Sequence, residues 1–391
     1  MALPLDARLT ALLEQQPFPR FSQEEFARRK RALIGAMQRM QVDHLILCGE
    51  QRVGSGVAWI TGWPTTTEAL VVVSPSEKDL MFVEWYNHLP LATRMAQDTD
   101  VKWGEHAGID KVITELQRRG ARRVGFIGPL SYRKCRKVEG AFALFEMNRE
   151  YVELRLTKSP EEIDWLRIGA AYSDAAIDAL RRELKPGLTE RDLCDITERA
   201  YVPHGGTTQI HYFGVASMEN PDCCVPRQFA ENRKVQAGDC VFCELSGSFW
   251  DYPGQVLRTF TVAADPTPLY RDLYATAEAA FDAIVSVLRA GTTSRQIVEV
   301  SGVIEKAGFT TCDDILHGYG GGYFAPVLGS RSRPAGRVPD LTLTAGMTVV
   351  VQPNVITKDQ RAGVQVGELL HITDHGFERL HQAPRALFRV G

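Results

Sequence analysis

The stretch that organises the chain is Lys158-Ser159-Pro160-Glu161-Glu162-Ile163. Serine is a strong helix N-cap, proline suits the first helical position, and carboxylates stabilise the first turn. We therefore predict a helix that begins at residue 160 and continues until Pro186-Gly187 stops it. The pattern of the chain changes just before this helix, so we predict a domain boundary there, with domains at 1–153 and 154–391.

The residues before this boundary alternate between helical and strand patterns. Ser22 is followed three residues later by Glu25, a capping-box pattern that predicts a helix over 21–40. Strands are predicted at the apolar runs 44–48, 68–73, 80–83 and 123–127. Alternating strands and helices predict a three-layer α/β domain.

The residues after the boundary predict a second mixed domain. Thr189 precedes an acidic first turn and begins another helix. Further helices are predicted at 270–290 and 293–307, and strands at 239–245, 255–262 and 347–353. The chain as a whole is therefore of the α/β (α+β) class.

Composition narrows the possible functions. The chain has 391 residues, a formal charge of -3 and 44% hydrophobic residues, values that are ordinary for a globular protein. A near-neutral chain gives no reason to expect a nucleic acid partner, and no apolar run reaches the roughly 18 residues of a membrane span. Residues 1–20 lack the apolar core of a signal peptide, and the eight cysteines do not form a disulfide pattern, so we expect a cytoplasmic protein.

Cys240 and Cys243 form a C-x-x-C pair. No second pair follows at zinc-binding spacing. We therefore interpret them as buried strand cysteines.

Five segments, in the same order along the chain, resemble motifs of one family. They are Trp59-Ile60-Thr61-Gly62-Trp63, residues 158–163, Gly238-Asp239 with Arg258-Thr259-Phe260, His317-Gly318-Tyr319-Gly320, and Gly346-Met347 with Gln352-Pro353. The chain is similar to the creatinase, aminopeptidase P and prolidase family. This resemblance implies an N-terminal creatinase-like α/β domain and a C-terminal pita-bread catalytic domain. It also implies a homodimer, in which Trp59, Trp63, Trp85 and Tyr86 are candidate interface residues.

The chain departs from this family at the metal site. The resemblance implies five ligand positions for two divalent ions, and here these are Glu244, Gln255, Gly321, Gln352 and Gly367. Amides and glycines supply no charge to balance two buried dications. We therefore expect no metal and no other cofactor.

Three residues are candidates for catalysis. Glu244 is the carboxylate left at a ligand position, and we interpret it as a base or nucleophile, or alternatively as a structural ion pair with Arg258. His317 could move protons, or could be a structural turn histidine. Glu368 could replace the carboxylate lost at Gly367, although strand alternation would turn it to the other face unless a bulge intervened.

Other side chains are candidates for binding a polar, planar substrate. These are Gln255, Arg258, Gln352 and Gln365, with Tyr319 and Tyr323 as lining residues. His211 and His371 are reserve proton carriers.

From the resemblance to creatinase we expect a metal-independent hydrolase of a small non-peptide C–N bond, such as an amide, amidine or urea-like group. Three alternatives remain: an Xaa-Pro aminopeptidase or prolidase-type metallopeptidase, a lyase on the same fold, and a non-catalytic peptide-binding module. The expected partners are a small-molecule substrate and a second copy of the chain, with no nucleic acid and no membrane.

Overall fold

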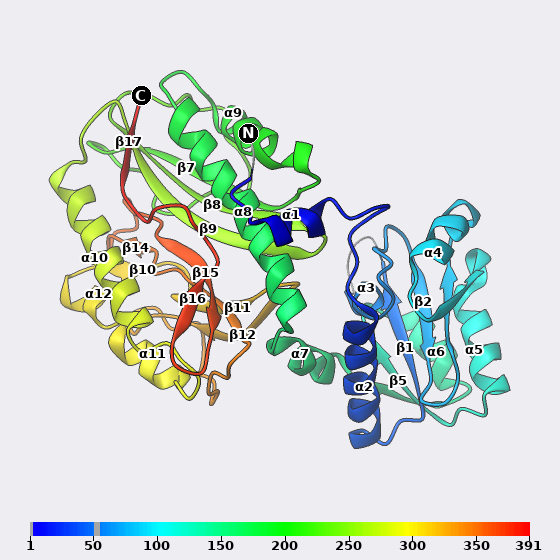
Figure 1. Ribbon diagram of the computed structural model, residues 1–391. Helices are drawn as coiled ribbons and strands as arrows, with labels where there is room; N and C mark the ends of the chain where they lie inside the picture. Colours follow the sequence, from blue (N-terminus) through cyan, green and yellow to red (C-terminus); the bar gives the residue numbers. More distant parts are fainter. Residues whose placement is uncertain (1–2, 51–54) are drawn as a thin grey trace. The chain divides into compact units, whose positions relative to one another are not determined.

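The computed structural model describes residues 3–50 and 55–391, and it confirms the α/β class (Figure 1). The chain forms two compact units. One unit is Gln15–Arg155, and the other joins residues 3–14 to Leu156–Gly391. No helix in these described ranges has the length and apolar character needed to cross a membrane.

The first unit is built on a six-stranded sheet of order β4-β3-β2-β1-β5-β6. Ile46 on β1 packs in a core with Val112 and Leu116 of α5, whereas its neighbour Leu47 lies beside Gly56 of α3. Successive strand residues therefore face helices on opposite sides of the sheet, which confirms the three-layer arrangement. The strands are β1 (His44–Gly49), β2 (Ala69–Val73), β3 (Asp79–Val83), β4 (Thr99–Trp103), β5 (Arg123–Ile127) and β6 (Ala143–Glu146). The α-helices are α2 (Gln23–Arg39), α3 (Gly56–Thr61), α4 (Leu89–Met95), α5 (Gly108–Arg118), α6 (Tyr132–Glu139) and α7 (Asn148–Leu156).

Local sequence accounts for the helix ends. The Ser22 hydroxyl accepts from the Glu25 amide at 3.0 Å, so the predicted cap of α2 forms.

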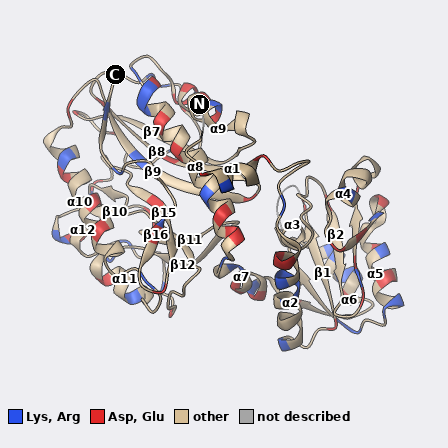
Figure 2. Cartoon of the chain, viewed as in Figure 1, with Lys and Arg blue, Asp and Glu red and all other residues tan. Residues whose placement is uncertain are grey.

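Charged residues of both signs occur along α2 and α5 (Figure 2). Such faces are typical of solvated helices.

The second unit holds a nine-stranded sheet of order β12-β11-β13-β15-β9-β8-β7, with β16 paired to β15 and β17 to β9. Its long central strands are β7 (Thr207–Ser217), β8 (Asp239–Phe249) and β9 (Tyr252–Val262). The others are β11 (Leu316–Tyr319), β12 (Tyr323–Leu328), β13 (Thr348–Val351), β15 (Gly367–Ile372), β16 (Phe377–Arg379) and β17 (Phe388–Val390). A separate pair is made by β10 (Thr310–Thr311) and β14 (Val355–Ile356).

In addition to α1, described below, this unit contains the α-helices α8 (Pro160–Glu183), α9 (Glu190–Tyr201), α10 (Pro268–Val285), α11 (Ser294–Val300) and α12 (Val303–Lys306). The expected single helix over 293–307 is divided into α11 and α12. Cys240 and Cys243 are fully buried on β8, as the sequence indicated.

Helix α8 begins where the sequence predicted. Ser159 and Glu162 form a capping box, with Pro160 in the first turn. Tyr252 then donates a 2.9 Å hydrogen bond to Glu162, which ties this helix start to β9.

Farther along, α8 lies against the sheet at glycines. A side chain on Gly254 would place its Cβ only 2.2 Å from the Ala170 backbone, and one on Gly169 would lie 2.2 Å from the Tyr252 oxygen. The Ser173 hydroxyl also accepts from the Gly247 amide at 2.8 Å. The helix and the sheet therefore touch backbone to backbone.

The start of the chain differs from the expected domain at 1–153. Helix α1 (Ala7–Leu13) belongs to the second unit. Arg8 forms an ion pair with Asp164 on α8, and Gln382 donates to the Pro4 carbonyl at 3.2 Å. These contacts join distant parts of the sequence, so local patterns carry no sign of them.

We predict that Gly254→Ala destabilises the protein by about 1–3 kcal/mol or more, because the added methyl group would overlap the α8 backbone. Urea unfolding would measure the loss. Gly376→Ala is the control, since its added Cβ would meet nothing within 4 Å. Equal stability of the two variants would contradict the close contact.

Candidate functional site

The hairpin of β8 and β9 places two candidate residues on one face. Glu244 lies opposite Leu257, and Ser246 lies opposite Gln255. Residues two apart on a strand point to the same side, so Glu244 and Gln255 share a face. The Gln255 amide nitrogen donates a short hydrogen bond to the Glu244 carboxylate.

Glu244 is partly exposed, whereas Gln255 is buried. Loss of solvation raises the pKa of Glu244, and the nearby charges of Asp313 and Asp314 raise it further, to about 8. A carboxyl group with a pKa close to neutrality can both hold and release a proton, which suits acid–base chemistry.

His317 on β11 extends this arrangement. Its Nε2 lies 3.0 Å from the Gln255 amide oxygen, and its Nδ1 lies 2.9 Å from Asp314. An amide oxygen can only accept, so in this arrangement Nε2 carries the hydrogen. The chain Glu244–Gln255–His317–Asp314 is therefore continuously hydrogen-bonded.

Tyrosines enclose the histidine. The Tyr323 ring stacks on the imidazole with centroids 4.0 Å apart, and its hydroxyl donates to Asp314. Tyr319 is edge-on to the same imidazole, and its hydroxyl donates to Ser246 at 3.2 Å. As a result His317 is only 1% exposed while Tyr323 is 55% exposed.

Gln352 closes the cluster on another side. Its amide oxygen accepts from Gln255 at 3.4 Å, and its amide nitrogen donates to Asp313 at 3.4 Å. The cluster reaches solvent at Glu244, Asp313 and Tyr323.

Asp313 and Asp314 were not singled out by sequence analysis. The available signal was a pair of acidic residues just before the His317 strand. They were missed because neither occupies a motif position.

Two predicted site residues lie on the opposite face of the sheet. Arg258 is opposite Cys243, the neighbour of Glu244, and Glu368 is opposite Val256. Strand alternation therefore turns both away from Glu244, and the bulge that could have turned Glu368 back does not form.

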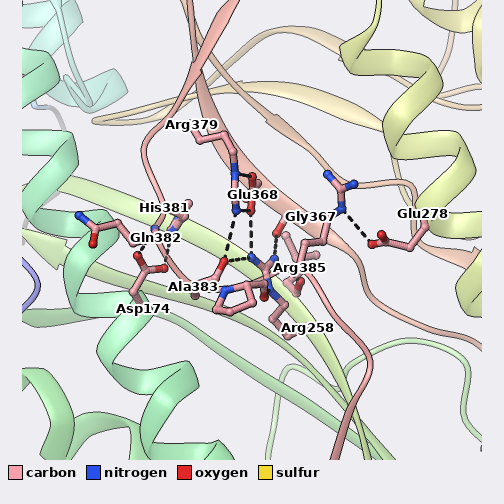
Figure 3. Close-up of polar contacts among 12 residues, drawn as sticks. Asp174, Arg258, Glu278, Gly367, Glu368, Arg379, His381, Gln382, Ala383 and Arg385 are labelled. Carbon is pink, nitrogen blue, oxygen red and sulfur yellow. Dashed lines mark hydrogen bonds and ion pairs between the residues drawn. The ribbon is translucent and has the colours of Figure 1, made fainter.

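Figure 3 shows where these two residues go. Arg258 donates to Glu368 at 2.9 Å, and Arg379 binds the same carboxylate through two nitrogens. Arg258 also donates to the backbone oxygens of Gly367, Ala383 and Pro384. The alternative pair of Arg258 with Glu244 is therefore not formed.

Burial alone would raise the pKa of Glu368. Hydrogen bonds from Arg379 and the charge of Arg258 outweigh burial and lower the pKa to about 2. Glu368 is thus a permanently charged ion-pair partner of Arg258 and Arg379, and its role is structural.

The remaining candidates lie in other contacts. Gln365 is buried, and its backbone is bonded to Thr259. His211 contacts Tyr201 and Glu198, and burial lowers its pKa to about 4. His371 contacts Glu378.

The arrangement does not fit a pair of divalent ions. Gln255 turns an N–H donor toward Glu244, and a side chain on Gly367 would lie 2.6 Å from the Val351 oxygen. Within the described residues, no three His, Cys, Asp or Glu side chains are grouped so as to hold a metal. Of the five positions that the family resemblance assigns to metal ligands, only Glu244 carries an anionic oxygen, and such ions need several.

The chain is similar to known peptidases in sequence. The model of metallopeptidase family M24 matches residues 164–374. A Sinorhizobium fredii protein named an uncharacterized hydrolase/peptidase, y4tL, is 26% identical over 95% of this chain and 97% of its own length. An Xaa-Pro dipeptidase of Pyrococcus furiosus is 23% identical over 60% of this chain and 66% of its own.

The fold agrees with a solved relative. The structure of an Xaa-Pro dipeptidase from Bacillus anthracis matches with a TM-score of 0.79 and 22% identity, covering 93% of this chain and all of that one. The expected creatinase-like domain followed by a pita-bread domain is confirmed.

The expected function is wrong. A creatinase-like hydrolase of a non-peptide C–N bond is overturned by relatives named as peptidases of dipeptides. The inference of a non-peptide substrate failed because the identity of the metal-ligand residues determines how the attacking water is activated. They do not identify the bond that is cleaved.

We predict that Glu244 contributes a fall in the free energy of unfolding as the pH rises from about 5 to about 8. The pKa of Glu244 is raised above its ordinary value of 4.5, so folding favours the neutral form, and this stability is lost as the pH rises through the folded-state pKa. The slope from this group is at most about 1.4 kcal/mol per pH unit.

Urea unfolding of the wild type, Glu244→Gln and Glu299→Gln at several pH values would test this. Glu244→Gln should lose this dependence of the unfolding free energy on pH. Glu299→Gln should retain it, because the Glu299 side chain is 75% exposed. The same slope in all three proteins would exclude a raised pKa at Glu244.

Proposed function

This chain belongs to metallopeptidase family M24, and from that membership we propose that it hydrolyses the peptide bond of dipeptides. Its relatives named Xaa-Pro dipeptidase support this class of substrate. The observation that carries the proposal is the hydrogen-bonded chain Glu244–Gln255–His317–Asp314, which meets solvent at a carboxyl group suited to acid–base work.

The proposed reaction uses Glu244 as the group that moves the proton. Its ionised carboxylate takes a proton from a water molecule as the water oxygen attacks the carbonyl carbon. The proton then passes to the leaving nitrogen as the C–N bond breaks, which regenerates the carboxylate.

Gln255 and His317 act as positioning residues. Gln255 fixes the Glu244 carboxylate through its amide nitrogen, and His317 fixes Gln255 through the amide oxygen. Asp314 and Tyr323 hold the imidazole in place. Gln352 and Tyr319 are the proposed substrate contacts that remain at this cluster.

The proposed chemistry has no metal step, because the residues at the family's ligand positions do not fit two cations. Glu244 must therefore be ionised to act as the base, and with its pKa of about 8 turnover should increase as the pH rises toward that value.

We also propose that the protein forms a homodimer and is cytoplasmic. Trp85 and Tyr86 are 44% and 64% exposed, which supports an interface role for them. Trp59 and Trp63 are buried within their own unit and cannot contribute. All eight cysteines are free thiols, which is consistent with a reducing compartment.

We predict that the protein releases free amino acids from at least one member of a panel of Xaa-Pro and other dipeptides, followed by mass spectrometry. Glu244→Gln should lower turnover by about 100-fold or more, the usual scale for loss of a general base. Glu299→Gln should leave turnover unchanged. No release from any dipeptide by the folded wild type would refute the proposal.

We predict that the purified protein holds well under one transition-metal ion per chain and that chelators leave turnover unchanged. The reason is the replacement of anionic ligands by amides and glycines. Elemental analysis after mild purification would measure the content. Two tightly held ions per chain would restore the dimetal mechanism.

A further inference from the structure

The second unit contains a cavity of about 220 Å³ that the Glu244 cluster does not line. Hydrogen bonds hold its walls together. Gln382 donates to the Pro4 carbonyl at 3.2 Å, and the Gln382 backbone amide donates to Asp174 at 2.6 Å. Pockets for drug-sized ligands are about 300–1,000 Å³, so this cavity suits a smaller molecule. Its walls come from three segments, residues 4–9, residues 167–174 of α8 and residues 378–382.

The cavity lies on the other side of the sheet from the candidate catalytic residues. Arg379 lines it and binds the Glu368 carboxylate through two nitrogens. Glu368 is on the face of the sheet opposite Glu244, and Figure 3 shows it with Arg379, near Asp174 and Gln382. The sheet therefore separates a ligand in this cavity from one at Glu244.

Asp174 is a buried carboxylate in the wall of the cavity and is 5% exposed. One of its oxygens contacts His381 Nδ1 at 2.8 Å, and the other accepts from the Gln382 backbone. Across residues 3–50 and 55–391, no lysine or arginine pairs with it. A carboxylate offers about four acceptor positions, so Asp174 can accept further N–H groups from a ligand.

Arg379 brings the opposite charge to the same cavity. Its Nε and Nη2 donate to Glu368 and to the Ala383 carbonyl, whereas its Nη1 bonds to none of the described residues. The hydrogen bond to Glu368 raises the pKa of Arg379, and the nearby charge of Asp174 adds to this effect. A free guanidinium N–H group is a good donor to a carboxylate.

The other charges on the wall leave this pattern unchanged. Arg167 and Glu378 pair with each other at 2.7 Å, so these two charges balance. Asp6 is a second, exposed carboxylate, and one of its oxygens accepts from the Leu9 amide at 2.8 Å. Apolar side chains complete the wall, namely Leu5, Leu9, Ala171 and Leu380.

We propose that this cavity binds a free α-amino acid with a small apolar side chain. The ammonium group fills the open acceptor positions of Asp174, the carboxylate accepts from Arg379 Nη1, and the side chain packs on the apolar wall. A ligand with only a negative charge would face Asp174 and Asp6. A ligand with only a positive charge would leave the Arg379 donor unmatched.

Hydrolysis of a dipeptide yields free amino acids, so the identification of the ligand as a reaction product rests on the proposed function. The cavity would then hold a product on the face of the sheet opposite the catalytic residues. Binding of an amino acid requires no turnover, so the cavity and the reaction can be tested separately.

Titration of the full chain with L-valine, followed by isothermal calorimetry, tests the site. We expect saturable binding of one valine. Isovalerate lacks the ammonium group of valine and isobutylamine lacks its carboxylate, while both keep the branched carbon skeleton. Each should bind at least about ten-fold more weakly, which corresponds to about 1.4 kcal/mol, because one charged contact is lost.

Asp174→Asn should weaken valine binding at least about ten-fold, since an amide lacks the negative charge and has one acceptor oxygen. Leu5→Trp is a second variant that fills the cavity and keeps its charged groups, and it decides the question if the first variant fails to fold. Asp178→Asn is the matched control on the same helix, where the side chain is 41% exposed. It should bind valine like the wild type, and so should Glu244→Gln.

Equal valine binding by the wild type and a folded Asp174→Asn or Leu5→Trp variant would overturn the site, and so would a wild type that binds no valine. Loss of binding in Glu244→Gln would place the valine at the catalytic residues instead. Isovalerate or isobutylamine binding as tightly as valine would refute the amino acid class. Asp174-dependent binding without cleavage of any dipeptide would keep the site and reject the proposed function, whereas cleavage without such binding would do the reverse.

Discussion

Every residue of β9 is buried, so its longest polar side chains, Gln255 and Arg258, need partners inside the protein. Gln255 meets this constraint on one face through Glu244, His317 and Gln352. Arg258 meets it on the other face through Glu368 and backbone oxygens. The strand thus carries the Glu244 network on one face and the Arg258–Glu368 network on the other. The candidate site depends on this separation, because it keeps the arginine charges away from Glu244.

Local sequence predicted the features whose causes are local. The Ser159–Glu162 capping box fixes the start of α8, and alternation along β15 was enough to question a catalytic role for Glu368. The direction of the Gln255 amide could not be predicted. It depends on His317, which is 62 residues away and reaches Gln255 only through the order of the strands. Asp314 was missed for a different reason: it lies only three residues before His317 but occupies no motif position.

The family resemblance predicted the fold better than the reaction. Fold follows from apolar patterns, caps and turns spread over the whole chain, and these survive when a few site residues change. The reaction depends on a handful of side chains at one cluster. Replacement of ligands by Gln255 and Gln352 was a sound observation. The inference from it to a non-peptide substrate was not, because both kinds of substrate present an amide-like carbon to the attacking water.

The position of α1 has a consequence for how the protein is made. Pro4 is bonded to Gln382, 378 residues later, and Arg8 is paired with Asp164. During translation these first residues leave the ribosome long before their partners exist. Residues 15–155 can collapse around their own sheet while the segment before them stays unpaired. The segment that begins the chain therefore cannot complete its native contacts until residue 382 has been made.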